Sequence, residues 1–191
     1  ERLHQEDLAQ AFGVLPASKY VELGGGSIAC IAALIRKYST RPIVDIAELA
    51  KVLCFNYAIG NCDAHLKNYS LVSNATKDKK VAISLAPAYD LVSTTYYPRF
   101  DRDLAMNYGN TRDIDKVDAS CFAGVSKALG MTPKNLANLA VPIVENLDAA
   151  VRDAGDGKYC DVLETTPYVA DNLRDDMAGR LEVLSAFVDA S

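Results

Sequence analysis

The sequence of 191 residues contains no tryptophan, only two histidines, and no apolar run longer than the eight residues 28–35. A helix that crosses a bilayer needs about 20 consecutive apolar residues, so the sequence predicts no membrane segment. The five cysteines include no CxxC pair, which argues against a structural zinc site and is typical of free thiols in a reducing compartment. We therefore expect a cytoplasmic protein without a disulfide framework.

The sequence also has fewer basic residues than acidic ones, 20 against 25. The formal net charge is −5, and residues 148–191 alone carry ten acidic and four basic side chains. A nucleic-acid platform needs the opposite balance. Because half of the residues are hydrophobic and no repeat or low-complexity tract appears, we interpret residues 1–191 as one globular unit. The chain starts at Glu1 without an initiator Met or a signal-peptide pattern, and we expect it to be a fragment of a longer protein.

The hydrophobic pattern predicts a mainly helical α+β fold with one central β-hairpin. Ser27 is expected to cap a buried helix, Gly60 to end another, and Pro142 to kink or split a third. Residues 91–115 are expected to be irregular. The predicted helices cover 6–12, 28–38, 45–59, 118–129, 133–154 and 168–190, and the predicted strands cover 69–72 and 81–85.

The segment Gly60-Asn61-Cys62-Asp63-Ala64-His65-Leu66-Lys67-Asn68 concentrates polar side chains between a helix and a strand. In it, Asp63 offers a carboxylate and Asn68 an amide oxygen. Together they could orient a hydroxyl nucleophile and hold a hard cation. Taken alone, the pattern Asp-x-His-x-x-Asn is more often typical of capping and turn residues than of a catalytic loop. Cys62 next to His65 is a weaker candidate for nucleophilic catalysis, because neighbouring loop residues rarely align as thiolate and base.

A further carboxylate follows the second predicted strand, at Asp90 in Ala86-Pro87-Ala88-Tyr89-Asp90. If the two strands pair antiparallel, the chain leaves the second strand at the end where it entered the first. Asn68 and Asp90 then lie at the same edge of the hairpin. An Asp that positions an acceptor hydroxyl, with an Asn and an Asp that hold Mg²⁺ against ATP, is the arrangement used by phosphotransferases.

Three stretches, 1–8, 60–70 and 86–93, resemble the HipA family of bacterial serine/threonine kinases in order and spacing. The resemblance implies a protein-kinase-like C-terminal lobe with ATP and Mg²⁺ as cofactors. The roles that it implies are a catalytic aspartate at Asp63, a magnesium pair at Asn68 and Asp90, and nucleotide-side positions at His65, Lys67 and Tyr89.

The same resemblance places the glycine-rich loop, the nucleotide-anchoring lysine and the adenine hinge upstream of this sequence. Gly24-Gly25-Gly26-Ser27 does not replace them, because it lacks the GK[ST] ending and reads as the entry to a capped helix. We therefore expect the isolated fragment to be inactive. A protein with a Ser or Thr acceptor is the implied substrate.

Family members often act as toxins held by a DNA-binding antitoxin, so a HipB-like antitoxin is the implied partner. Lys127 lies where some members contact the operator, but the second cation is missing at Gly130, which argues against direct DNA contact. Two other interpretations stay open. One is a small-molecule or lipid kinase, and the other is a non-catalytic module that binds an antitoxin.

Overall fold

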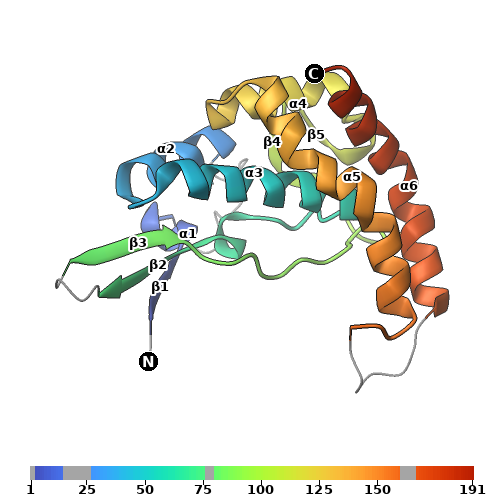
Figure 1. Cartoon of the computed structure of the whole chain (residues 1–191), viewed down its shortest axis with the longest axis horizontal. Helices are drawn as coiled ribbons and strands as arrows, with labels where there is room; N and C mark the ends of the chain where they lie inside the picture. Colours follow the sequence, from blue (N-terminus) through green and yellow to red (C-terminus); the bar gives the residue numbers. More distant parts are fainter. Residues whose placement is uncertain (1–2, 15–26, 76–79, 160–166) are drawn as a thin grey trace.

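The computed structural model describes residues 3–14, 27–75, 80–159 and 167–191. Most of these residues are helical. Figure 1 shows α3 crossing the centre of the molecule, α5 and α6 side by side, and a small sheet beyond the start of α3. The helices are α1 (Leu8–Ala11), α2 (Ile28–Tyr38), α3 (Pro42–Ile59), α4 (Ala119–Leu129), α5 (Pro133–Gly155) and α6 (Pro167–Asp189), with 3₁₀ turns η3 (Leu66–Asn68) and η4 (Ile114–Lys116).

The predicted cap of α2 is confirmed, because Ser27 accepts a hydrogen bond from the backbone N–H of Cys30. Helix α4 is capped in the same way by Asp118, which accepts from the backbone N–H of Cys121. The predicted start of α3 at Asp45 was late by one turn. Pro42 occupies the first turn, where its missing N–H costs nothing, and the buried Asp45 carboxylate instead accepts from the backbone N–H of Leu85 at 2.8 Å.

Pro142 does not split α5, contrary to one of the two predicted outcomes. The side chain of Pro142 is exposed, and so is Asn138, whose carbonyl loses its helical partner. Solvent can therefore satisfy that carbonyl. The carbonyl of Pro142 itself accepts a hydrogen bond from the Asn146 side chain at 2.9 Å.

The predicted hairpin is present as β2 (Ser70–Ala75) and β3 (Val81–Leu85), paired antiparallel. Its other edge carries β1 (His4–Asp7), so the sheet has three strands in the order β1-β2-β3. The predicted helix over 6–12 is thus wrong at its start: residues 4–7 pair with β2, and the helix covers only α1, capped by Asp7.

A second antiparallel pair, β4 (Asp103–Tyr108) and β5 (Thr111–Asp113), lies where the sequence was expected to be irregular. The turn at Gly109 has φ +62°, and the Cα of Cys121 would lie 3.0 Å from an added Cβ. A glycine is therefore required between the strands.

The core joins α3 to β4, α4 and α6 through aromatic rings. Tyr57 of α3 packs against Tyr108 and Phe122, with ring centroids 5.9 and 5.2 Å apart, and Phe122 stacks on Phe187 at 5.2 Å. All four side chains are buried. Within the described ranges, no helix is long and apolar enough to cross a membrane.

Candidate active site

The polar loop 60–68, called here the Asp63 loop, is held at both ends. It begins where α3 ends at Gly60, whose φ of +74° is the left-handed conformation that glycine adopts without strain. It ends in η3, which leads into β2. The loop is therefore anchored between a buried helix and a paired strand.

Asn61 connects the Asp63 loop to the segment that contains Asp90. Its side chain is 1% exposed. Asn61 Oδ1 accepts from the backbone N–H of Asp63 at 3.1 Å, and Asn61 Nδ2 donates to Asn56 Oδ1 at 3.0 Å and to the carbonyl of Asp90 at 3.2 Å. One buried amide thus fixes the backbone of both carboxylate residues, a function that the sequence pattern did not reveal.

The predicted approach of Asn68 and Asp90 is confirmed. Asn68 Nδ2 donates directly to Asp90 Oδ2, and Asn68 Oδ1 accepts from the backbone N–H of His65 at 3.1 Å. Asp90 has φ +57°, and no other non-glycine residue among those described has a positive φ. Left-handed strain of this kind concentrates at functional sites, where the surrounding contacts maintain it.

The three predicted nucleotide-side residues lie around this pair. His65 is buried, with Nε2 3.8 Å from Asp63 Oδ1. Lys67 is exposed, and its carbonyl accepts from the Tyr89 hydroxyl at 2.7 Å. That hydroxyl also lies 2.6 Å from Ser70 Oγ, so Tyr89 ties the Asp90 segment to the loop and to β2. Their contact with a nucleotide stays a prediction.

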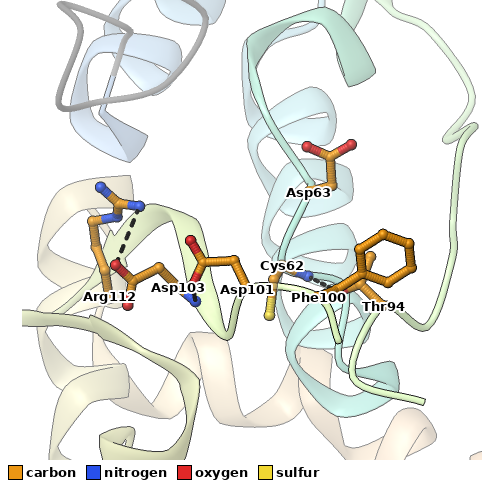
Figure 2. Close-up of a pocket in the computed structure, with 7 residues that line it drawn as sticks. All are labelled: Cys62, Asp63, Thr94, Phe100, Asp101, Asp103 and Arg112. Carbon is orange, nitrogen blue, oxygen red and sulfur yellow. Dashed lines mark hydrogen bonds and ion pairs between the residues drawn. The ribbon is translucent and has the colours of Figure 1, made fainter. Parts of the chain in front are cut away.

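Asp63 also lines a cavity of about 480 Å³. Its side chain is 49% exposed, whereas Asn68 is 8% exposed and lies outside the cavity lining. Figure 2 shows the residues that line the cavity, which are Cys62, Asp63, Thr94, Phe100, Asp101, Asp103 and Arg112. The Asp63 carboxylate is thus accessible to a molecule that enters this cavity.

Thr94 fixes one wall of the cavity. The carbonyl of Gly60 accepts from the backbone N–H groups of Thr94 and Thr95 at 3.0 and 3.1 Å and from Thr94 Oγ1 at 2.9 Å. Thr94 Oγ1 in turn accepts from the backbone N–H of Cys62 at 2.9 Å. Burial raises the pKa of the Cys62 thiol, which disfavours the thiolate that a nucleophile would need.

Helix α6 braces the same segment from the other side. Thr95 Oγ1 donates to Asp176 Oδ2 at 2.7 Å, and that carboxylate accepts from Arg180 Nη2 at 2.6 Å. The buried Arg180 also donates through Nε to the carbonyl of Ala58 at 3.2 Å. We call Thr95, Asp176 and Arg180 the α6 brace. Its only indication in the sequence is a pair of charged residues four apart on a predicted helix.

The donor chemistry at Asn68 and Asp90 fits magnesium. Among the described residues, no group of three or more His, Cys, Asp or Glu side chains could hold a metal by itself. Mg²⁺, however, commonly takes one or two protein oxygens and completes its shell with phosphates and water. Asn68 Oδ1 and the Asp90 carboxylate each keep lone pairs beyond the hydrogen bonds described above. The pair therefore suits a metal that arrives with a nucleotide.

Comparison with known families gives a match over most of the chain. A family model described as "HipA-like C-terminal domain" matches residues 1–151. A protein from Sinorhizobium fredii named "Putative kinase Y4mE" is 32% identical over 187 residues, which is 96% of this chain and 42% of that protein. The "Serine/threonine-protein kinase toxin HipA" of Shewanella oneidensis is 33% identical over 95 residues, 50% of this chain and 21% of that protein.

A solved structure extends the likeness to the fold. The HipA, HipB and operator DNA complex of Shewanella oneidensis contains a chain that matches with a TM-score of 0.83 and 25% identity. The match covers 99% of this chain and 45% of that one. The predicted fold class, a mainly helical kinase-like C-terminal lobe, is confirmed. The chain spans less than half the length of the relatives given above.

Proposed function

Because the chain belongs to the HipA-like C-terminal domain family, we propose that it forms the catalytic lobe of a serine/threonine protein kinase. The observation that carries the proposal is the hydrogen bond from Asn68 to Asp90 at the open end of the hairpin. Asn61 connects Asp63 to the same segment, because its side chain bonds the backbone of both Asp63 and Asp90. A proton-accepting carboxylate next to a pair of hard oxygens is the arrangement that phosphoryl transfer from ATP requires.

Each residue then has a defined task. Asp63 accepts the hydrogen bond of the incoming Ser or Thr hydroxyl, and its exposure toward the cavity leaves room for that hydroxyl. Asn68 and Asp90 would hold Mg²⁺, which when bound offsets the charge of the ATP phosphates. Asn61 holds the backbone of Asp63 and of Asp90 in a fixed relative position. The exposed Lys67 adds a positive charge on the same loop.

The proposal concerns the intact protein. The chain spans less than half of the relatives' length, so we propose that the rest of the ATP site lies outside it and that the isolated chain is inactive. Because one relative is named as a toxin and the matched structure contains HipB, we further propose an antitoxin of that type as partner. We propose that the intact protein acts in the cytoplasm, where ATP is available and where the free cysteines among the described residues would stay reduced.

The test is the Asp63→Asn variant of the intact protein. Asn61 holds the backbone of Asp63 and leaves its side chain half exposed, so this variant should fold normally. Phosphoryl transfer from labelled ATP should fall by about 10²-fold or more, the typical loss when a general base is removed. Glu145→Gln, an exposed charge on α5, is the matched control and should keep full activity. Unchanged turnover in Asp63→Asn would refute the assignment.

The magnesium pair is tested separately with Asp90→Asn. This variant should weaken the binding of MgATP while it leaves the circular dichroism spectrum unchanged. A titration of the intact protein with ATP at several magnesium concentrations measures it. An unaltered magnesium dependence would exclude Asp90 as a ligand.

A further inference from the structure

We propose that the α6 brace, formed by Thr95, Asp176 and Arg180, positions the proposed active site for phosphoryl transfer. Its three residues would set where Asp63 lies relative to Asp90, without touching substrate or nucleotide themselves. The inference rests on the proposed kinase function and adds positioning residues that lie outside the segments that carry the family resemblance.

The segments that carry Asp63 and Asp90 are joined at two points. At the first, the Asn61 side chain accepts from the backbone N–H of Asp63 at 3.1 Å and donates to the carbonyl of Asp90 at 3.2 Å. At the second, Thr94 Oγ1 accepts from the backbone N–H of Cys62 at 2.9 Å (Figure 2). The relative position of the two carboxylate residues therefore depends on both junctions.

Thr95 connects the second junction to helix α6. Its backbone N–H donates to the carbonyl of Gly60, the first residue of the Asp63 loop, at 3.1 Å. Its hydroxyl donates in the opposite direction, to Asp176 Oδ2 at 2.7 Å. Because the side chain of Thr95 is buried, water does not readily replace either contact. One residue thus holds the start of the loop and the second junction against α6.

Arg180 fixes the other end of this connection. Its Nη2 donates to Asp176 Oδ2 at 2.6 Å, and its Nε donates to the carbonyl of Ala58 in the last turn of α3 at 3.2 Å. The desolvation of a buried ion pair offsets much of its attraction, so stability alone is a weak reason for such a pair. Two directed bonds from one planar guanidinium do, however, define the position of Asp176 relative to α3.

The proposed magnesium pair is held by contacts that do not involve α6. Asn68 donates to the Asp90 carboxylate, and the Tyr89 hydroxyl donates to the carbonyl of Lys67 at 2.7 Å and lies 2.6 Å from Ser70 Oγ. Release of the brace should therefore leave the binding of MgATP nearly unchanged while it misplaces the proposed base. A small misplacement of a reacting group slows the chemical step more than it weakens binding.

The test compares Thr95→Val with Thr95→Ser in the intact protein. Valine keeps the shape of the side chain and removes the hydroxyl, whereas serine keeps the hydroxyl that donates to Asp176. Thr95→Val should lower kcat for transfer from labelled ATP at least about tenfold and change KM for ATP by less than about threefold. Thr95→Ser should stay within about twofold of the unchanged protein in both constants.

A second arginine of α6 provides the matched control. Arg174 pairs with Asp148 on α5 at 2.7 Å, so Arg174→Met removes an ion pair of the same helix and should keep kcat within about twofold. Arg180→Lys should lower kcat as Thr95→Val does, because one ammonium group cannot reproduce the two directed bonds. Combining the two should add less than about twofold to the larger single loss, because both act through one carboxylate.

Hydrogen exchange of the intact protein separates failure of this inference from failure of the proposed function, because it needs no turnover. In Thr95→Val, the backbone N–H of Cys62 should exchange at least about fivefold faster, and that of Leu85 on β3 should not change.

Equal kcat in Thr95→Val and Thr95→Ser, or an equal loss in Arg174→Met, would overturn the inference even if Asp63 is required for transfer. If the unchanged protein transferred no phosphoryl group, the proposed function would fail. Exchange at Cys62 would then decide alone: faster exchange in Thr95→Val would support α6 as the element that positions the loop, and unchanged exchange would refute it.

Discussion

Replacing Gly60 with alanine tests whether the junction of α3, the Asp63 loop and the α6 brace is as tightly built as the contacts indicate. An added Cβ would lie 1.9 Å from Thr95 Oγ1 and 2.8 Å from Arg180 Nη2. The left-handed φ of +74° adds about 1–2 kcal/mol of backbone strain for a residue with a side chain. Thr95 must also move, which breaks its hydrogen bond to the Asp176 carboxylate.

The expected loss in the free energy of unfolding is therefore the sum of two effects. Backbone strain contributes about 1–2 kcal/mol, and the lost hydrogen bond to a charged acceptor about 1.5–3 kcal/mol. We expect Gly60→Ala to destabilise the chain by about 2.5–5 kcal/mol in total. Urea denaturation followed by circular dichroism measures this value.

Gly13→Ala is the matched control. Gly13 has φ +66°, but an added Cβ there meets no atom within 4 Å. That variant should cost only the strain of about 1–2 kcal/mol. In a background of Thr95→Ala, which removes the nearest clashing atom, the cost of Gly60→Ala should fall by at least about 1 kcal/mol. If Gly60→Ala costs no more than Gly13→Ala, the account of this junction is wrong.

Three further variants test individual contacts. Asn61→Ala removes three hydrogen bonds of a buried side chain and should lower the free energy of unfolding by about 2–3 kcal/mol, measured by urea denaturation. Tyr89→Phe removes a hydroxyl bonded to the Lys67 carbonyl, and its cost of about 1 kcal/mol should appear as a lower denaturation midpoint. The Arg174 guanidinium lowers the pKa of the Asp148 carboxyl. This partly exposed ion pair therefore stabilises the folded state at pH values above the ordinary pKa of the carboxyl, and the stabilisation is lost as the pH falls through the lowered pKa. Arg174→Met should thus lower the melting temperature near neutral pH, and the difference from the unchanged protein should disappear in acid as Asp148 becomes protonated, as measured by thermal melts over a range of pH.

The features that the sequence predicted well depend on short-range order. The hairpin of β2 and β3 forms from neighbouring runs of β-prone residues, and antiparallel pairing alone brings Asn68 to Asp90. The ends of α3 and α4 follow from Gly60 and Gly130, which adopt the left-handed conformation that stops a helix. Each of these depends on residues within about one element of each other.

The features that were missed depend on partners far away in the sequence. Residues 6 and 7 were expected to start a helix, but residues 4–7 pair with β2 because the edge of the hairpin is open to them. Gln5 then donates a hydrogen bond to Ser70, 65 positions later. Tertiary pairing of this kind overrides local propensity. The Gly-Asn turn at 109–110, between the strands β4 and β5, was a local signal that could have been recognised.

The α6 brace has no sequence signature beyond the spacing of Asp176 and Arg180, four residues apart on one helix. Thr95 meets Asp176 across 81 positions, and Arg180 reaches Ala58 across 122. The residues adjacent to an arginine in the sequence of a helix do not show whether its side chain is buried or exposed to solvent. Burial depends on how the helix packs against the rest of the fold. Only the three-dimensional arrangement identifies these residues as part of the site.

The position of the brace has a consequence for how this unit should be cut and exchanged. The match to the family model covers residues 1–151, whereas Asp176 and Arg180 lie in α6, which begins at Pro167. A swap between relatives that was cut at residue 151 would transplant the Asp63 loop without the helix that secures Thr95. Chimeras joined after residue 189 should keep the conformation of the Asp63 loop. In chimeras joined at residue 151 the loop should be less rigid, because Thr95 loses its hydrogen bond to Asp176.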